Sequence, residues 1–399
     1  MKKFFLAFFF FFLLIGNLYQ PNTRVQASTQ FLDVPNNYWA KKEIDFLAGT
    51  GIIQGYKNGK FGINEKVTRS QAAIMIVRAL KLDTKNRPNP GFQDVPRTHP
   101  AYNEIAAAVD EGIFSKSSKF YPSKTLTRAE MAKVLVNAFH LKYEQDVHYK
   151  DVNPSNWSAK FISTLSTNGI TTGYADLTYK GNQPITRSHF SVFLARVLNE
   201  SFRPKIIIFP KRIAPEVYYP VVKGIGSTAE KKINSAFYQK GLQGKQAFQE
   251  VQKLKKEYPQ DSLTKYYTYS MTYKVMRSDS RFISIKFNDY SYTGGAHGLY
   301  DYSSYNFETS TGKQFHTLKE FFGDSSSDYV SIINNEIWDK IYQRQLTDPY
   351  YFENFDSIDP ETDRFYLTNK GVGVYFSLYE YTSFAEGIPE FVIPYSYFE

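Results

Sequence analysis

The sequence predicts a multidomain protein: an all-α bundle built from three repeats, followed by an α+β domain with an antiparallel sheet. Three observations lead to this fold class. One short motif occurs three times, with its arginines 59 residues apart. Apolar residues at helical spacing fill the first half. Beyond residue 216 this spacing gives way to runs rich in Tyr, Thr and Val, which favour strands. A motif that returns at a constant period indicates a repeated supersecondary unit.

The chain begins with a pattern typical of a secretory signal. Lys2 and Lys3 precede an apolar run over residues 4–18, and small residues before Ser28 suit cleavage after residue 27. The alternative is a retained membrane anchor, but a run of 15 residues is shorter than the roughly 20 that a spanning helix needs. We therefore expect residues 1–27 to be a signal peptide. The mature protein is then secreted and makes no membrane contact.

The repeated motif predicts the start of a helix in each copy. Thr68 and Thr127 are followed three residues later by Gln or Glu, which is the spacing of a capping box. Thr186 is followed by His189 instead, so its box is weaker. A helix N-terminus favours an anion, and an arginine at the first helical position adds a fork that suits a carboxylate or phosphate. The alternative is a solvated arginine in an ordinary first turn. The arginines concerned are Arg69, Arg128 and Arg187.

Each copy carries the same landmarks in the same order. An aromatic residue and Asp-Val open the repeat, an apolar helix follows, Gly-Ile ends that helix, and a polar loop with one aromatic leads to the second helix. We expect the opening aspartates to be caps or turn formers. No such unit can bury its apolar face alone, so the three must pack together. The expected boundaries are 28–90, 91–147 and 148–199 for the repeats, 200–216 for a stiff proline-containing linker, and 217–399 for the second domain.

This pattern resembles the S-layer homology domain over about residues 30–200. Repeat one shows it in Phe31-x-Asp33-Val34, Trp39-Ala40, Gly51-Ile52 and Gly55-Tyr56. The resemblance implies a three-pronged helical bundle on a Gram-positive surface. It also implies binding to an anionic secondary cell-wall polysaccharide, often through a pyruvylated amino sugar and with no cofactor or metal, and motif arginines that line grooves between the prongs. The residues expected to bind the polysaccharide are Arg69, Arg128, Arg187, Trp39, Trp157, Gly55, Tyr56, Gly173 and Tyr174.

The three copies are not equivalent. Repeat two has Pro100 where the others have Trp, and Ser115-Lys116 where they have Gly-Tyr. We therefore expect grooves built from repeats one and three to be the more complete. Trp39 and Trp157 have two interpretations, since each could pack over a helix start or stack on a sugar.

Charge is divided unevenly along the chain. Residues 28–216 carry 26 basic and 16 acidic side chains, whereas residues 217–399 carry 19 and 23. A basic half indicates a polyanionic partner. Nucleic acid is one common partner of this kind, but export argues against it and favours a wall polymer. The sequence has no cysteine, which excludes disulfide and thiolate chemistry.

The second half predicts an antiparallel sheet with helices. It resembles the extracellular domain of the lysozyme-sensing anti-sigma factor family, and related domains of unknown function accompany some polysaccharide deacetylases. The resemblance implies a protein or glycan ligand but no single activity. Its landmarks are Tyr219-Pro220, Ile233-Asn234, residues 292–298, Asn306-Phe307, Thr311-Gly312-Lys313, Tyr375-Phe376, Tyr379-Glu380 and Gly387. The expected strands are 217–222, 266–277, 282–292, 299–307, 372–378 and 390–393. The expected helices are 327–345 and 228–257, the latter with a break near residues 241–244.

Two features of this half could carry function. His297 lies near glycines and is a candidate catalytic residue, with Glu380 as a possible acidic partner. A tight hairpin with His297 bonded to the backbone is the simpler interpretation. An acidic and aromatic segment suits a basic partner, or is a solvated loop. Its residues are Asp348, Tyr350, Tyr351, Phe352, Glu353, Phe355, Asp356, Asp359, Glu361 and Asp363.

These features favour a non-enzymatic surface protein, anchored noncovalently by its repeats and displaying a C-terminal binding module. One alternative is a wall-modifying enzyme, a glycan hydrolase or deacetylase, in which the C-terminal domain is catalytic or accessory. Another is a structural component of a surface array.

Overall fold

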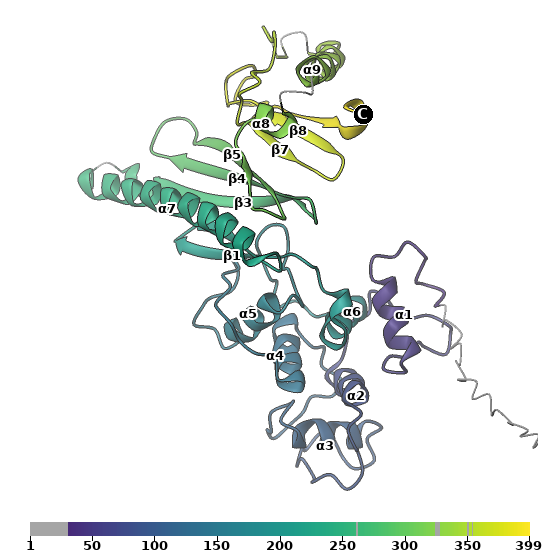
Figure 1. Ribbon diagram of the computed structural model, residues 1–399. Helices are drawn as coiled ribbons and strands as arrows, with labels where there is room; N and C mark the ends of the chain where they lie inside the picture. Colours follow the sequence, from purple (N-terminus) through teal and green to yellow (C-terminus); the bar gives the residue numbers. More distant parts are fainter. Residues whose placement is uncertain (1–30, 261, 324–327, 349–350, 353) are drawn as a thin grey trace, which may run out of the picture.

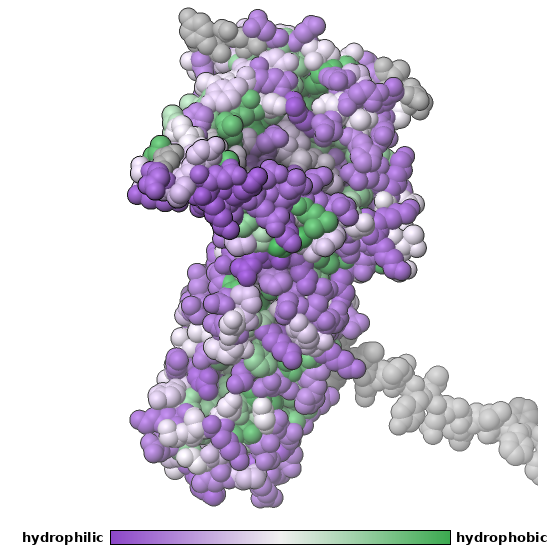
Figure 2. Space-filling model, turned by 90° about the vertical axis from the view of Figure 1, so that its left-hand side faces the viewer, coloured by the Kyte–Doolittle hydropathy of each residue, from purple (hydrophilic) through white to green (hydrophobic). Residues whose placement is uncertain are grey.

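The computed structural model describes residues 31–260, 262–323, 328–348, 351–352 and 354–399. The expected signal peptide, residues 1–27, lies outside these ranges. A helical part is followed by a strand-rich part, and the two are stacked lengthwise with a narrower region between them (Figure 1, Figure 2). Among the helices of the described ranges, none has the length and apolarity needed to cross a membrane.

Over residues 31–199, all of which are described, the fold consists of two helices from each repeat. The second helix of each pair begins at the motif arginine, as predicted. Thr68 and Thr127 form full capping boxes, whereas the His189 ring turns to the Thr186 hydroxyl, with Nδ1 2.7 Å from Oγ1. The helices are α1 Lys41–Gly49, α2 Arg69–Leu80, α3 Tyr102–Asp110, α4 Arg128–Phe139, α5 Ala159–Thr167 and α6 Arg187–Leu198.

Helices that pack side by side come from different repeats: α1 with α6, α3 with α2, and α5 with α4. At the centre, the apolar residues before the motif threonines form a closed ring of backbone hydrogen bonds. Val67 donates to Ile185, Ile185 to Leu126, and Leu126 to Val67, at 3.0, 2.9 and 2.8 Å. Isolated β-bridges lie beside this ring. The helical part is therefore not purely α, in contrast to the prediction.

The strand-rich part contains a six-stranded sheet, in the order β1 to β6, covered on one face by the long helix α7, Ser227–Glu257 (Figure 1). β2 and β3 pair in parallel at Val217 and Met271, so the sheet is mixed. Helix α7 supplies the crossover that parallel neighbours require. The predicted antiparallel arrangement is confirmed for its other strand pairs. The strands are β1 Ile207–Ala214, β2 Val217–Lys223, β3 Thr268–Ser278, β4 Phe282–Tyr292, β5 Leu299–Glu308 and β6 Gln314–Phe315.

A second, three-stranded antiparallel sheet has its own apolar core with the C-terminal helices. Its elements are β7 Phe365–Leu367, β8 Gly371–Tyr375, β9 Glu390–Pro394, α8 Leu318–Phe322 and α9 Tyr329–Gln345. Short 3-10 turns are η1 Glu200–Phe202, η2 Thr264–Tyr266 and η3 Tyr395–Tyr397.

Helix α7 is continuous, so the break expected near Gly241 and Gly244 does not occur. A Cβ at Gly241 would lie 2.9 Å from Tyr219 Cδ1, and one at Gly244 would lie 2.8 Å from Met271 Sδ. The two glycines let the helix approach the sheet closely rather than ending it.

Residues 200–216, predicted as a stiff linker, instead contain η1 and β1. Pro210 is tolerated within β1 because this strand is at the edge of the sheet. Phe209 of β1 is buried in the core of the helical part, and Leu177 of repeat three is buried in the core of the sheet. The two parts therefore share an apolar junction, which explains why the connecting segment is ordered as a strand.

Candidate functional site

Each motif arginine reaches across to another repeat. Its Nε donates to the backbone carbonyl of that repeat's loop aromatic, and its guanidinium lies over the same ring in a cation–π contact. These contacts order the arginines and tie the repeats together. The Nε to oxygen distances are 2.7 Å for Arg69 and Phe120, 2.9 Å for Arg128 and Tyr179, and 2.8 Å for Arg187 and Phe61. The guanidinium carbons lie 4.9, 4.8 and 4.5 Å from the ring centroids.

The helix N-termini themselves are already occupied. The backbone N–H groups of the three arginines donate to the carbonyls of Lys124, Gln183 and Glu65 in neighbouring loops, at 2.8 to 3.0 Å. The prediction that these N–H groups receive an anion was therefore wrong, because the packing of the repeats uses them first. Any recognition of an anion must come from side chains.

The aspartates that open the repeats do not cap helices, which was one of the two roles predicted for them. The Asp33 carboxylate accepts hydrogen bonds from the backbone of Phe61, Gly62 and Ile63, at 2.6, 2.8 and 3.3 Å. Burial opposes its ionisation, but these backbone donors outweigh burial and lower the pKa of Asp33. Asp94 and Asp151 accept from their own loops in the same way. These residues hold the loop aromatics beneath the arginines.

The most complete grouping of the predicted residues lies beside α6, in a hollow of about 170 Å³ that we call the Trp39 groove. Trp39 comes from repeat one, Tyr174 from repeat three, and Arg128 from repeat two. The prediction was that repeats one and three build the more complete grooves. Here these two repeats supply the aromatic side chains, but the arginine comes from repeat two. Trp39 is 55% exposed and its ring centroid lies 5.0 Å from that of His189. The groove is lined by Trp39, Arg128, Gly173, Tyr174, His189 and Arg196, among others.

The Trp39 groove concentrates positive charge. Arg128 is only 4% exposed. Its Nε donates to Tyr179, and its terminal nitrogens have no hydrogen-bond or ion-pair partner among the described residues. The buried Nε of Arg196 also has no partner within the described chain. Burial, followed by the charges of Arg128 and Lys66, lowers the pKa of His189 to about 4, so this ring is neutral at pH 7. None of the described residues that line the groove is acidic.

An equivalent hollow of about 270 Å³, the Trp157 groove, lies beside α4. Trp157 is also 55% exposed, so neither tryptophan is a core residue. Counted from Gly112, the position of Gly55 and Gly173 is held here by Lys116, one residue later than the Ser115 of the prediction. Arg69 Nη1 lies 3.8 Å from Glu130 Oε1. The arginine of this groove is therefore already opposed by a carboxylate.

The third arginine, Arg187, makes a different set of contacts. It is 6% exposed, its Nη2 donates to Gln54 at 2.8 Å, and its guanidinium lies 5.0 Å from the Tyr56 ring centroid. A Cβ at Gly55 would lie 2.4 Å from Phe31 Cε1, and one at Gly173 would lie 2.2 Å from Tyr149 Cε1. These two glycines make room for the aromatic residue that opens the repeat, and thereby place the tyrosine that follows them.

His297 forms a local contact cluster in the C-terminal half. Its Nδ1 lies 3.1 Å from the Gly298 carbonyl and its Nε2 lies 2.9 Å from the Tyr379 hydroxyl, while its ring stacks on Phe384 at 3.7 Å. Glu380 pairs with Arg364 at 2.8 Å rather than with His297. The backbone-bonded interpretation of His297 is confirmed. Within the described ranges, no group of three or more His, Asp or Glu side chains is arranged to hold a metal ion.

The aromatic members of the acidic segment are mostly internal. Phe352 and Phe355 are 1% and 3% exposed and belong to the core of the smaller sheet. Tyr350 and Glu353 lie outside the described residues. The aromatic rings therefore support the fold, whereas Asp359, Glu361 and Asp363 line a surface hollow of about 380 Å³.

The S-layer homology family model matches residues 30–73, 91–132 and 148–191. The chain carries three S-layer homology repeats. In the second half, the model "Deacetylase PdaC" matches residues 213–300, and "Protein of unknown function (DUF3298)" matches residues 319–396. The resemblance to a lysozyme-sensing domain remains a prediction, since these comparisons name DUF3298 instead.

Several curated relatives each match less than half of this chain. The chain is 34% identical over 176 residues to the surface-layer 125 kDa protein of Lysinibacillus sphaericus, covering 42% of this chain and 15% of that protein. It is 33% identical over 191 residues to an uncharacterized cell wall amidase of Bacillus anthracis, covering 46% and 35%. It is 28% identical over 185 residues to an S-layer protein of Bacillus licheniformis, covering 45% and 21%. The chain thus spans no more than 35% of any of these three relatives.

Solved structures of DUF3298 proteins also resemble part of the chain. One from Bacteroides fragilis is 22% identical, with a TM-score of 0.35, and covers 45% of this chain and 79% of its own. Another, from Pseudomonas aeruginosa, is 14% identical, with a TM-score of 0.32, and covers 48% and 91%. Together, the S-layer homology repeats and the surface-layer relatives identify a cell-surface protein.

Proposed function

We propose that the repeats anchor this protein noncovalently to an anionic secondary cell-wall polysaccharide, and that the C-terminal half is displayed as a binding module for a protein or glycan. One observation carries the anchoring role. Arg128 is only 4% exposed and its guanidinium lies over the rings of Tyr174, Tyr179 and Phe193, yet its terminal nitrogens have no hydrogen-bond or ion-pair partner among the described residues. Because buried charges in proteins are normally paired, an acidic group of the polymer is the natural partner.

The other residues of the groove fit the same ligand. An exposed indole offers a flat face on which a sugar ring can stack, and Trp39 presents one at the mouth of the groove. Arg128 and Arg196 supply N–H donors for a carboxylate such as a pyruvyl group. Neutral His189 can exchange hydrogen bonds with a hydroxyl without adding charge. Because part of this attraction is electrostatic, high salt weakens it.

The matched pair of tryptophans tests this proposal. Trp39→Ala should reduce retention on purified cell walls about tenfold, since stacked aromatic anchors are often worth more than 1 kcal/mol. Trp157→Ala removes an equally exposed ring from the groove in which Glu130 opposes the arginine, and should change retention by less than about threefold. The measurement is the bound fraction in a wall pull-down of the full chain. Unchanged retention of Trp39→Ala would refute the role of this groove.

A wall-modifying activity is the second candidate function. It is favoured by the match of residues 213–300 to the deacetylase family model and by the amidase-named relative. In that case the C-terminal half is catalytic, or assists a catalytic partner. Release of acetate or of peptide from peptidoglycan by the full chain, tested with added divalent metals, distinguishes this candidate from a purely binding role.

A further inference from the structure

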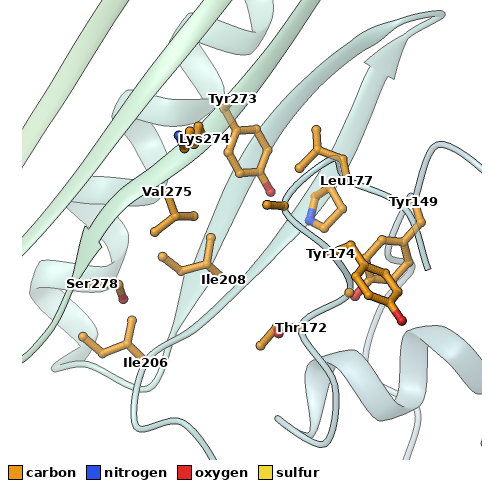
Figure 3. Close-up of a pocket in the computed structure, with 13 residues that line it drawn as sticks. Tyr149, Thr172, Tyr174, Leu177, Ile206, Ile208, Tyr273, Lys274, Val275 and Ser278 are labelled. Atoms are coloured by element: carbon orange, nitrogen blue, oxygen red, sulfur yellow. The ribbon is translucent and has the colours of Figure 1, made fainter. Parts of the chain in front are cut away.

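A cavity of about 300 Å³ lies between repeat three and the six-stranded sheet (Figure 3). Its walls come from the loop at residues 172–177, from the start of β1, and from β3 at Tyr273, Lys274 and Val275. The pairing between β2 and β3 is confined to Val217 and Met271, and the cavity lies beside the residues of β3 that follow Met271. Its volume is at the lower end of small-molecule sites, which span about 300–1,000 Å³.

This cavity adjoins the Trp39 groove. Thr172, Gly173 and Tyr174 line both hollows, so a single turn separates them. Gly173 has φ +68°, and Tyr149 lies too close to admit a side chain at that position. The turn is therefore thin, and a ligand chain leaving the groove over Tyr174 would enter the cavity next.

Basic side chains lie along the way from the Trp39 groove to the cavity. Arg128 lies 5.0 Å from the Tyr174 ring centroid, and Lys180 Nζ, partly neutralised by Asp176 at 3.8 Å, lies 4.2 Å from it. Lys274 of β3 lines the cavity, and its side chain is exposed. None of the described residues that line the cavity is acidic. Tyr174 and the apolar side chains of the walls offer faces for sugar rings.

We propose that this cavity is a second subsite for the wall polysaccharide, in which the sugar units adjoining the one held in the Trp39 groove contact β3 at Lys274 and Val275. The inference rests on the anchoring function proposed above. It makes the C-terminal domain part of the anchor, and it means that longer polymer chains bind more tightly than single repeating units, because the second contact is intramolecular once the first has formed.

The test compares polymer lengths on the full chain. Wall polysaccharide released by acid from the producing strain is separated into single repeating units and longer chains, and binding of each is measured by titration calorimetry. Lys274→Glu should weaken the longer chains about fivefold, equivalent to about 1 kcal/mol, and leave the single unit unchanged. Val275→Trp fills the cavity from a position that is 40% exposed and should have the same selective effect. Lys370→Glu, an equal charge change in the exposed turn before β8, is the control.

The outcomes separate the two proposals. If the wild-type chain binds neither length, the anchoring function falls and this subsite falls with it. If single units and longer chains bind equally well, or if both cavity variants behave like Lys370→Glu, the subsite is refuted while anchoring stands. An equal loss for both lengths in Lys274→Glu would also refute it, because Lys274 would then act at the groove itself.

Discussion

The Trp39 and Trp157 grooves are built on the same framework but differ in charge. Both pair an equally exposed tryptophan from one repeat with an arginine that stacks on a loop aromatic. At Arg69 the helix position that faces the groove holds Glu130, 3.8 Å away. At Arg128 the corresponding position holds His189, which is neutral at pH 7. One capping residue therefore decides whether the arginine of a groove is already paired or still free for an external anion.

The largest difference between the grooves should appear when their arginines are replaced. Arg128→Gln should lower affinity for the wall polysaccharide at least tenfold, since hydrogen bonds to charged groups are worth about 1.5–3 kcal/mol. Arg69→Gln should change it less than about twofold, because that arginine already faces a carboxylate. Binding is measured by calorimetry at a temperature where thermal melting shows each variant to be folded. Equal losses would show that the charge difference between the grooves has no functional consequence.

A milder change should make the Trp157 groove more like the Trp39 groove. Glu130→Gln removes the carboxylate but keeps a side chain that can complete the capping box, as Gln71 does in repeat one. We expect wall affinity to rise about twofold to fivefold, with stability altered by less than about 0.5 kcal/mol. Calorimetry and urea unfolding measure the two quantities. An unchanged affinity would mean that this groove lacks more than a free arginine.

The smallest effect at pH 7 concerns the capping position of α6, and this effect grows on the acid side of the stability profile. The pKa of His189 is about 4 in the fold, against about 6.5 in an unfolded chain, so the unfolded chain binds more protons between these values. Stability is therefore full above about pH 6.5 and declines as the pH falls towards 4. His189→Gln removes this loss and supplies the side chain of a full capping box. We expect it to gain about 0.5 kcal/mol at pH 7 and more at pH 5, as measured by urea unfolding. A gain that is the same at both pH values would exclude His189 as the cause.

Much of the helical part could be predicted from the sequence, because capping boxes and apolar periodicity are local signals. The motif fixed the helix starts at Arg69, Arg128 and Arg187. What could not be predicted was which copies meet. The spacing of the repeats shows which residues are equivalent, but it does not show which repeats lie next to one another. In the structure, Trp39 of repeat one lines the same groove as Arg128 of repeat two.

The other predictions that the structure corrects also depend on tertiary contacts. The sequence predicts helix N-termini that are open to an anion, but carbonyl groups of neighbouring loops accept their N–H hydrogen bonds. The prolines of residues 200–216 predict a linker. In the structure, Phe209 is buried in the core of the helical part, and β1 within this segment is an edge strand. Gly241 and Gly244 looked like helix breaks, and instead bring α7 close to Tyr219 and Met271. Each outcome depends on a partner distant in sequence.

The central ring at Val67, Leu126 and Ile185 makes the arrangement of the repeats tolerant of side-chain replacement. It is closed by main-chain atoms, which every amino acid except proline provides in full. Side-chain replacements on the outer faces of the three repeats therefore leave the hydrogen bonds of this ring in place. The two grooves can differ in charge while they share one framework.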